Sequence, residues 1–210
     1  MKLRLREGEV AVVGYGSLLS AGSISRTINR EYGGPFVLCH VEGWRRSWDA
    51  SMPNEAFYFL DHGERVYPRK ILYLNCRPLA AGATMNVALF VLGGDELKAM
   101  RDREWIYGEQ IVTSALRGVT IEGGDAVMYV ARDEHVLSGA SSREEAAVRA
   151  SYLRILDAAL QSTTPAFRAE YAATTDPVPP LMIDDVLDPE RPTPWERAGV
   201  TYHPERQINR

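Results

Sequence analysis

The chain has 210 residues, of which 45% are hydrophobic and 25% charged, and its formal net charge at pH 7 is −4. These values are typical of a soluble globular protein long enough for one domain with a substantial core. The net negative charge argues against nucleic acid or an anionic membrane as a partner, because both select basic surfaces. No apolar run approaches the ~20 residues that span a bilayer, and the charged start at 1–6 lacks the apolar stretch of a signal peptide. We therefore expect a cytoplasmic protein.

The first apolar run leads directly into a glycine-rich loop. Residues 11–13 have the pattern of a short buried strand, and the loop that follows consists of Gly14, Tyr15, Gly16, Ser17 and Leu18. The two glycines let backbone N–H groups face a cavity, because no Cβ atom stands in the way. Successive amides in such a turn form a nest for a carboxylate or an oxyanion, although a plain strand-ending turn explains the glycine pair equally well.

Better-known glycine motifs do not match this loop. Leu19 stands where a dinucleotide fingerprint has its third glycine, and no Gly-Lys-Ser or Gly-Lys-Thr follows for a phosphate-binding loop. The elbow that carries a nucleophilic serine needs glycine where Tyr15 and Leu19 stand. A serine hydrolase that uses Ser17 is therefore an alternative without an elbow, and no histidine has a sequence context that marks it as the base.

Three helices are expected along the chain. The polar segment 20–30 favours a short helix, and 96–103 favours another with Asp95 as its N-cap. A Ser-x-x-Glu capping box that begins at Ser141 or Ser142 predicts the longest helix. Its apolar stripe consists of Val148, Tyr152, Ile155 and Ala159.

Many short strands accompany these helices. They are expected at 36–41, 56–60, 71–75, 85–92, 110–116, 119–121 and 126–131, with a hairpin-type turn at 123–125. The run 85–92 is almost continuously apolar, which is typical of a strand buried on both faces. Because strands and helices do not alternate as βαβ units, the pattern predicts an α+β fold on a mixed or barrel-like sheet.

Polar and sulfur-containing residues outside the loop give weaker signals. Trp44 and Trp48 flank an arginine pair, which predicts either a surface clamp or wall packing with arginines that snorkel to solvent. Cys39 and Cys76 lie in separate apolar runs and are expected to be buried, reduced thiols. Because the histidines are scattered and no Cys-x-x-Cys pair occurs, we expect neither a metal site nor a cofactor.

The composition changes near the end of the chain. Seven of the twelve prolines fall between Pro177 and Pro204, so this segment cannot form a long regular helix. We expect one domain over 1–173 and an extended, proline-rich C-terminal extension over 174–210 that wraps the domain or a partner. The oligomeric state is open.

Two motifs resemble those of the γ-glutamylcyclotransferase family, especially its glutathione-degrading ChaC-like branch. Tyr15-Gly16-Ser17-Leu18 resembles the signature loop of the family. The stretch from Met100 to Glu104, followed by Tyr107, is similar to the Leu-Asp-x-Arg-Glu motif and later tyrosine of that branch, with a gap to the tyrosine that is one residue shorter. Looser similarities lie at 41–51 and at Tyr152, and together the resemblance covers roughly residues 10–160.

The resemblance implies a small, distorted β-barrel with helices around it and an enzyme that converts a γ-glutamyl group into 5-oxoproline. The α-amine of the substrate attacks its own γ-carbonyl, so no metal, cofactor or covalent enzyme intermediate is required. Glu104 would be the general acid and base, and an apolar surround from Trp105 and Ile106 would raise its pKa. The loop residues, Tyr107 and Tyr152 would bind the small-molecule γ-glutamyl substrate, with the loop amides on its carboxylate or oxyanion.

Alternatives to this assignment remain at the level of sequence. Glu104 could instead be a solvated carboxylate at a helix end, paired with Arg101 or Arg103. The chain could also be a non-catalytic member of the fold that binds a small molecule. The leaving group of the substrate, glutathione or another γ-glutamyl compound, cannot be identified from these residues.

Overall fold

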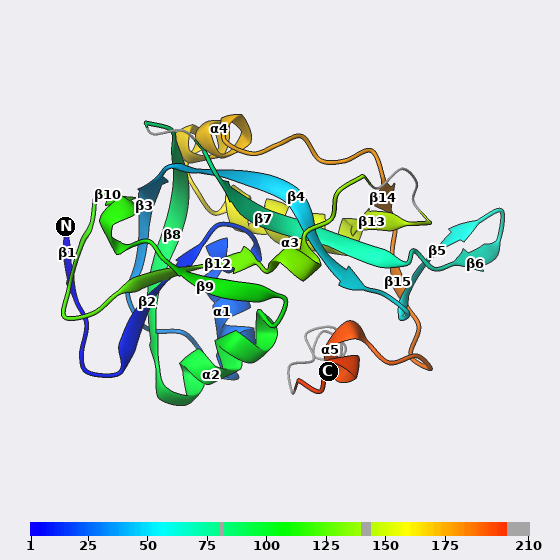
Figure 1. Ribbon diagram of the computed structural model, residues 1–210, viewed down its shortest axis with the longest axis horizontal. Helices are drawn as coiled ribbons and strands as arrows, with labels where there is room; N and C mark the ends of the chain where they lie inside the picture. The colour runs from blue at the N-terminus through cyan, green and yellow to red at the C-terminus, as the bar shows by residue number, and fades with distance from the viewer. Residues whose placement is uncertain (80–81, 140–143, 201–210) are drawn as a thin grey trace.

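The computed structural model describes residues 1–79, 82–139 and 144–200, and it confirms an α+β fold. The molecule is elongated, with the N-terminus near one tip and the β5–β6 hairpin projecting at the other (Figure 1). Within the described residues, no helix is long and apolar enough to cross a membrane. The expected cytoplasmic location stays a prediction.

Five helices and fifteen strands are assigned in the described residues. The helices are α1 (Ala21–Ile28), α2 (Gly94–Arg103), α3 (Ala150–Gln161), α4 (Pro165–Ala173) and α5 (Pro194–Arg197). The strands before α2 are β1 (Lys2–Arg4), β2 (Glu9–Gly14), β3 (Phe36–Glu42), β4 (Trp44–Pro53), β5 (Phe57–Asp61), β6 (Glu64–Val66), β7 (Lys70–Pro78) and β8 (Thr84–Gly93). Those after it are β9 (Tyr107–Ile111), β10 (Leu116–Arg117), β11 (Thr120–Glu122), β12 (Ala126–Ala131), β13 (Ala146–Arg149), β14 (Met182–Ile183) and β15 (Val186–Leu187).

The largest sheet holds the glycine loop at its centre. Its strand order is β10-β3-β8-β2-β12-β9, and β2 pairs with β8 antiparallel and with β12 parallel. Residues 85–90 and Leu92 of β8 are buried, as the continuous apolar pattern of 85–92 predicts. Because β2 is flanked on both sides, the loop that follows Gly14 begins from a fixed point in the core.

The second sheet, of order β14-β13-β7-β4, lies against the first without closing a barrel. Asn75 on β7 joins the two sheets, because its Oδ1 accepts a hydrogen bond of 2.9 Å from the backbone N–H of Ala131 on β12. At this junction a hydrogen bond between a side chain and the backbone takes the place of backbone pairing between two strands. The described strands therefore form open sheets, and the expected barrel is not a closed ring.

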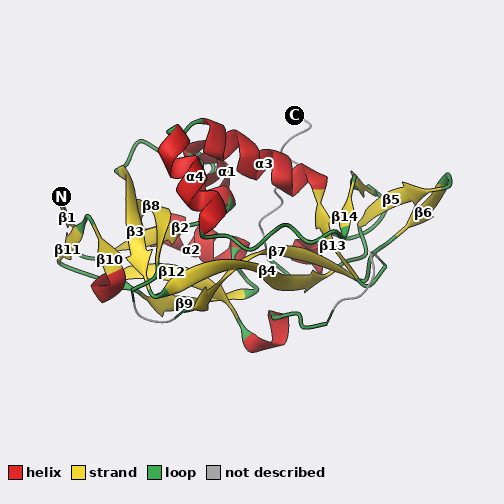
Figure 2. Cartoon of the chain, turned by 90° about the horizontal axis from the view of Figure 1, so that it is seen from above, coloured by secondary structure: helices red, strands yellow, loops and turns green. Residues whose placement is uncertain are grey.

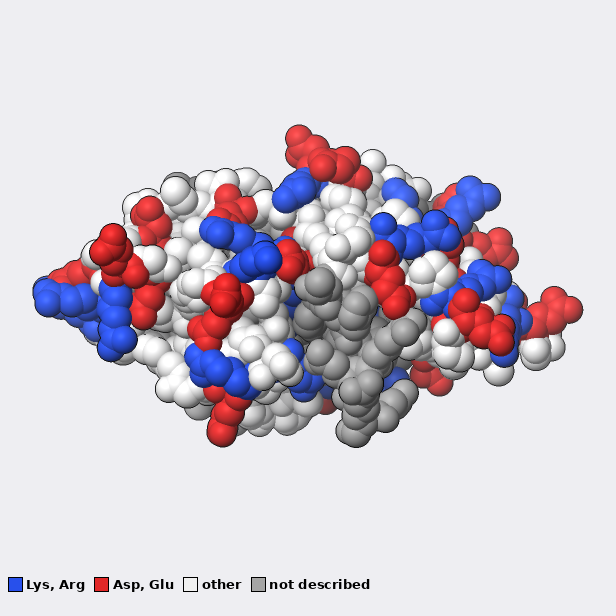
Figure 3. All heavy atoms as spheres, turned by 90° about the horizontal axis from the view of Figure 1, so that it is seen from below, with Lys and Arg blue, Asp and Glu red and all other residues white. Residues whose placement is uncertain are grey.

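Helices α1, α3 and α4 cover one side of these sheets, which is clearest when the chain is seen from above (Figure 2). Helix α1 begins where predicted, with the Ser20 side chain accepting from the Ser23 N–H, and its C-cap is Asn29 in the left-handed conformation, with a φ of 55°. Helix α2 begins one residue before Asp95, so the N-cap is Gly93 and the prediction of Asp95 was wrong. Figure 3 shows basic and acidic side chains interspersed on the face seen from below.

Three other expectations about elements were also wrong. Val148 belongs to β13, which pairs with β7, so α3 begins only at Ala150 and its stripe starts at Tyr152; Ser141 and Ser142 lie outside the described residues. The expected strand 110–116 is split by a short 3-10 helix at Thr113–Ala115. Residues 123–125 do not close a hairpin, because β11 pairs with β1 and β12 pairs with β2. In each case pairing with a distant segment overrides the local pattern.

The C-terminal segment is extended, as its prolines predict. After α4, which sequence patterns missed, β14 pairs with β13 and β15 pairs with β5. The short helix α5 then begins with a capping box between Thr193 and Glu196. The described part of the tail thus follows the domain surface, while the division of the chain at 173 stays a prediction.

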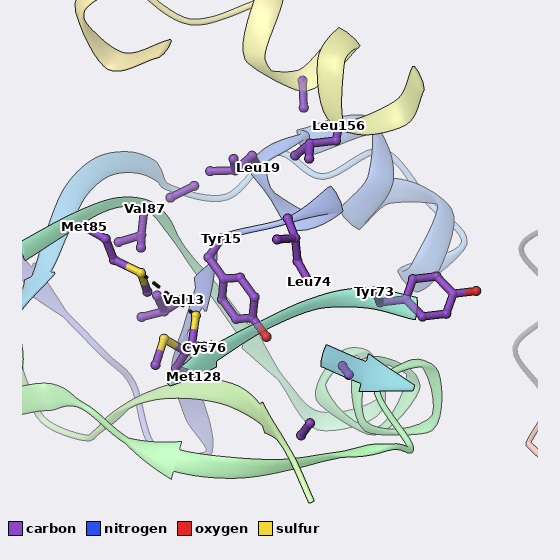
Figure 4. Packing of buried hydrophobic residues seen from close by; sticks show 14 of the residues in the cluster. Val13, Tyr15, Leu19, Tyr73, Leu74, Cys76, Met85, Val87, Met128 and Leu156 are labelled. Carbon is purple, nitrogen blue, oxygen red and sulfur yellow. Dashed lines mark hydrogen bonds between the residues drawn. The ribbon is translucent and has the colours of Figure 1, made fainter. Parts of the chain in front are cut away.

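The core beneath the glycine loop is densely packed with apolar side chains (Figure 4). The ring of Tyr15 lies beside Leu74 and Cys76 of β7, and the Sγ of Cys76 is 4.0 Å from the Sδ of Met85. Both cysteines are buried and reduced, as expected. Burial raises the pKa of Cys39 to about 11, so this thiol is not a nucleophile at neutral pH.

Candidate active site

A cavity lies between the end of β2, the end of α2 and the start of α3, and residues of β7 and α5 also line it. It brings together both sequence motifs, although they are almost ninety positions apart in the chain. The residues that line it and were expected from sequence are Tyr15, Gly16, Ser17, Leu18, Glu104, Tyr107 and Tyr152. Gly14 does not line it, and its substrate-binding role stays a prediction.

Glu104 ends helix α2 and turns its side chain into this cavity. The side chain is only 13% exposed, and its Oε1 lies 2.9 Å from the Nε of Arg103. Burial raises the pKa of Glu104 above its usual value, and the neighbouring guanidinium opposes that rise without cancelling it. The alternative of a helix-end carboxylate paired with Arg101 or Arg103 is right about the position and the Arg103 partner, but wrong about solvation, because the side chain is largely shielded from solvent; Arg101 instead pairs with Glu109.

Arg103 connects the carboxylate to the glycine loop, a role that sequence reasoning missed. Its Nη2 donates to the Oγ of Ser17 at 2.7 Å, while Nη1 donates to the Oγ1 of Thr27 at 2.7 Å and to the Oγ of Ser23 at 3.1 Å. One guanidinium thus holds Glu104, the loop and helix α1 in a fixed relation. The signal for it was present in the sequence, because an arginine immediately precedes the glutamate of the second motif.

The glycines of the loop are required by close contacts. A Cβ atom at Gly16 would lie 2.9 Å from the hydroxyl oxygen of Tyr152, and one at Gly14 would lie 2.6 Å from the carbonyl oxygen of Leu18. Real Cβ atoms do not approach other atoms so closely, so any larger residue would displace its neighbours. The Gly16 contact also explains why Tyr152 of α3 and the loop form one wall.

The tyrosines of the site are neutral groups with fixed orientations. The Tyr15 hydroxyl donates to the carbonyl of Tyr129 at 2.6 Å, and the Tyr107 hydroxyl donates to the carbonyl of Leu74 at 2.9 Å. The ring of Tyr152 meets the edges or faces of Trp48 and Tyr73 at nearly right angles. Burial raises the pKa of Tyr15, Tyr107 and Tyr152 above the usual value, so none of them supplies charge to the cavity.

Two further arginines and a tryptophan also line the cavity. Arg149 of β13 is buried, with its guanidinium carbon 3.9 Å from the centre of the Phe57 ring and its Nη1 3.5 Å from a carboxylate oxygen of Asp185. Arg26 reaches the cavity from the exposed side of α1. Trp195 of α5 is buried, and its indole N–H donates to the carbonyl of Arg103 at 3.3 Å. No local sequence pattern marked Trp195, because the tail brings it back from a distance.

The chemistry available is that of one proton-accepting carboxylate in a cationic, partly apolar cavity. The lining contains three arginines, Arg26, Arg103 and Arg149, and one carboxylate; Arg103 pairs with that carboxylate and Arg149 with Asp185 outside the lining. Such a cavity attracts an anionic ligand and can move a proton at a single position. Among the described residues, no group of three His, Cys, Asp or Glu side chains is placed to hold a metal ion.

Comparisons with known proteins assign the fold. No protein-family model matches the chain, and no curated protein matches its sequence. A solved structure described as a gamma-glutamyl cyclotransferase superposes with a TM-score of 0.51 at 12% identity, covering 82% of this chain and 94% of that one. YkqA from Bacillus subtilis superposes with a TM-score of 0.52 at 12% identity, covering 82% of this chain and 56% of that one. The chain therefore shares the fold of these two proteins.

Proposed function

We propose that this protein is a γ-glutamyl cyclotransferase that converts the γ-glutamyl group of a small amide or peptide into 5-oxoproline. The observation that carries the proposal is the position of Glu104, a largely buried carboxylate with a raised pKa in the same cavity as the glycine loop. Arg103 bridges the two motifs through hydrogen bonds to Ser17 and to Glu104 itself. The shared fold with a gamma-glutamyl cyclotransferase supports the same assignment.

In this reaction the substrate supplies both nucleophile and electrophile. Its α-amine forms a C–N bond to the γ-carbonyl carbon, and the original amide C–N bond breaks to release an amine. The attacking ammonium group loses two protons, one before and one after the new C–N bond forms. Glu104 takes each in turn and passes it to the leaving nitrogen, which departs as an ammonium ion, so the carboxylate ends unchanged. The main task of the cavity is to hold a near-attack geometry, which contributes up to ~7–11 kcal/mol in model reactions.

The residues around Glu104 fit the other demands of this chemistry. The buried Ile106 side chain lines the same cavity, and burial raises the pKa of Glu104, which makes the carboxylate a better proton acceptor. The arginines of the lining complement the carboxylate of a γ-glutamyl group. The loop amides are the donors we assign to that carboxylate or to the oxyanion that forms on the γ-carbonyl.

A serine hydrolase fits the cavity less well. The Ser17 hydroxyl accepts a hydrogen bond from Arg103, a donor that cannot act as a base because it stays protonated. In the part of the lining that the structure describes, no histidine is present to activate this serine. We therefore assign Ser17 to loop positioning.

The proposal is tested by incubating the purified protein with a panel of γ-glutamyl compounds and measuring 5-oxoproline. The panel should contain γ-glutamyl amino acids, glutathione and γ-glutamyl amines, so that it also identifies the leaving group. We expect 5-oxoproline from at least one compound and none from the matching α-glutamyl isomer, because its amide is on the α-carbonyl and its γ-carboxylate carries no amine to release. A panel with no release would contradict the proposal.

A further inference from the structure

Arg46 is the most deeply buried charged residue outside the cavity, with 0% of its surface exposed. The expectation that the arginines after Trp44 snorkel to solvent is therefore wrong for this residue. In the described residues its hydrogen bonds go to neutral acceptors, namely the carbonyl of Tyr15, both oxygens of Asn86, and the hydroxyls of Thr174 and Thr175. A buried charge whose hydrogen bonds all go to neutral groups is costly even with the Glu170 carboxylate near enough to attract it, so its position calls for a functional explanation.

The acceptor that links Arg46 to the active site is the carbonyl of Tyr15. This oxygen lies 3.2 Å from the Nε of Arg46 and also accepts a hydrogen bond of 2.8 Å from the Tyr171 hydroxyl. The Arg46 guanidinium in turn lies over the Tyr171 ring, 3.8 Å from its centre. Two side chains from β4 and α4, neither of which lines the cavity, thus hold one carbonyl of the loop.

The geometry of the peptide bond carries this restraint to Gly16. Because the described chain has no cis peptide bonds, the N–H of Gly16 points in the direction opposite to the carbonyl of Tyr15. That carbonyl points to Arg46 and Tyr171, so the N–H points away from them, and Gly16 itself lines the cavity. Within residues 1–79, 82–139 and 144–200, the Gly16 N–H donates to no acceptor, which leaves it available to a ligand.

We propose that Arg46 and Tyr171 are positioning residues that hold the Tyr15–Gly16 peptide so that its N–H donates to the anionic group of the substrate. A peptide before glycine rotates easily, since glycine has access to conformations closed to other residues. The buried guanidinium also polarises the carbonyl and so strengthens the N–H as a donor. The identity of the ligand in this inference rests on the proposed function, whereas the orientation of the Tyr15–Gly16 peptide does not.

The first test compares two tyrosine variants that lose the same atom. Tyr171→Phe removes a hydroxyl that binds the Tyr15 carbonyl, whereas Tyr32→Phe removes a hydroxyl that binds the carbonyls of Pro35 and Val91 in a separate cluster. We expect Tyr171→Phe to lower kcat/KM about 2- to 13-fold, the range of one hydrogen bond. Tyr32→Phe should leave kcat/KM unchanged even where it lowers the melting temperature. Equal losses in the two variants, or wild-type kcat/KM in Tyr171→Phe, would overturn the inference.

A second readout reports on the peptide itself. The sequence contains three Tyr-Gly pairs, Tyr15-Gly16, Tyr32-Gly33 and Tyr107-Gly108, so labelling tyrosine carbonyls with carbon-13 and glycine amides with nitrogen-15 isolates three NMR signals. We expect Tyr171→Phe to move the Tyr15-Gly16 signal and to leave the other two in place. A Tyr15-Gly16 signal that stays in place would overturn the inference.

The two readouts separate failure of the inference from failure of the proposed function. If the wild-type protein released no 5-oxoproline, the proposed function would fail, and the NMR signal alone would decide whether the pair holds the peptide. Arg46→Lys keeps the charge but loses the forked geometry of the guanidinium, and we expect it to lower kcat/KM more than Tyr171→Phe does. Should Arg46→Lys fail to fold, Tyr171→Phe carries the test, because it removes a single oxygen and keeps the ring under the guanidinium.

Discussion

The two sides of the cavity are held by different kinds of interaction. The loop side is fixed by fully buried groups, Arg46 and Tyr171 on the Tyr15 carbonyl. The tail side, which carries Trp195, is fastened near its end by an ion pair between Arg197 and Glu55 whose side chains are 54% and 45% exposed. Hydrogen bonds in a low-dielectric interior favour one arrangement, whereas exposed ion pairs contribute about 0–1 kcal/mol and are screened by salt. We therefore expect the loop side to determine the rate of the chemical step and the tail side to determine how readily the substrate enters the cavity.

The largest effect is expected at Glu104, which lies on the loop side. Glu104→Gln keeps the shape and polarity of the side chain but removes the titratable group. Turnover should fall at least ~100-fold, the lower end of the contribution from general acid–base catalysis, while substrate affinity changes far less. Steady-state kinetics on purified protein measures both quantities. A Gln variant with near-wild-type turnover would remove Glu104 from the mechanism.

The pH dependence of the same pair of proteins sharpens this expectation. Burial raises the pKa of Glu104 in the folded protein above its value in the unfolded chain. The contribution of protonated Glu104 to the stability of the folded protein is therefore fully present below the unfolded pKa, and it is lost as pH rises through the folded pKa. Activity should rise over the same interval, because the base is the ionised form. The difference in melting temperature between Glu104→Gln and wild type should therefore shift in favour of the variant as pH rises from the unfolded pKa of the glutamate through its raised folded pKa. A constant difference would contradict the raised pKa.

An intermediate effect is expected from closing the space at Gly16. Gly16→Val places a Cβ against the Tyr152 hydroxyl, and overpacking of this kind costs about 1–3 kcal/mol of stability. Its loss of kcat/KM should exceed that of Ser17→Ala. The matched control is Gly16→Ala with and without Tyr152→Phe, because removal of the hydroxyl relieves the closest contact. If Tyr152→Phe restores none of the stability that Gly16→Ala loses, the contact with the Tyr152 hydroxyl does not explain why residue 16 is glycine.

A smaller effect is expected at Ser17. Its hydroxyl contributes one hydrogen bond to Arg103, so Ser17→Ala should cost roughly 0.5–1.5 kcal/mol, about a 2- to 13-fold loss in kcat/KM. A nucleophilic serine would lose several orders of magnitude and would form a covalent adduct with a fluorophosphonate probe. Labelling of Ser17, seen as a mass increase on the intact protein, would overturn the cyclisation mechanism.

The smallest effect is expected on the tail side. Arg197→Gln removes the exposed ion pair with Glu55, and KM should rise by no more than about 5-fold, with kcat unchanged. High salt should reproduce this change in the wild-type protein and add little to the variant, because salt screens the same interaction. A large fall in kcat would show that the tail takes part in the chemical step, and it would contradict the proposed difference between the two sides.

Sequence patterns identified the parts of this site that lie in continuous motifs. The strand pattern of β8, the loop after β2 and the glutamate after α2 could each be read from neighbouring residues. Arg46 could not, because an arginine between tryptophans looks the same whether it snorkels or is buried. Its acceptor Thr174 is 128 positions away in the chain. Tyr171, which donates to the same Tyr15 carbonyl, is 156 positions from Tyr15.

The sequence pattern missed strand β13 for a related reason. Val148 is apolar and fits the stripe of the following helix, but parallel pairing with β7 holds it in extended form. Trp195 had no local signal at all, since its place in the cavity depends on where the tail attaches. Local pattern therefore predicts which segments form the site, and only tertiary structure shows which side chains hold them there.

The most direct measurement of the central claim is the identity of the product. A γ-glutamyl compound that the protein consumes should yield 5-oxoproline in an amount equal to the released amine, with no free glutamate and with the yield dependent on Glu104. In water enriched in oxygen-18, the 5-oxoproline should carry no label, because the amine of the substrate and not water attacks the γ-carbonyl. Labelled glutamate as the product would show hydrolysis and would contradict the account.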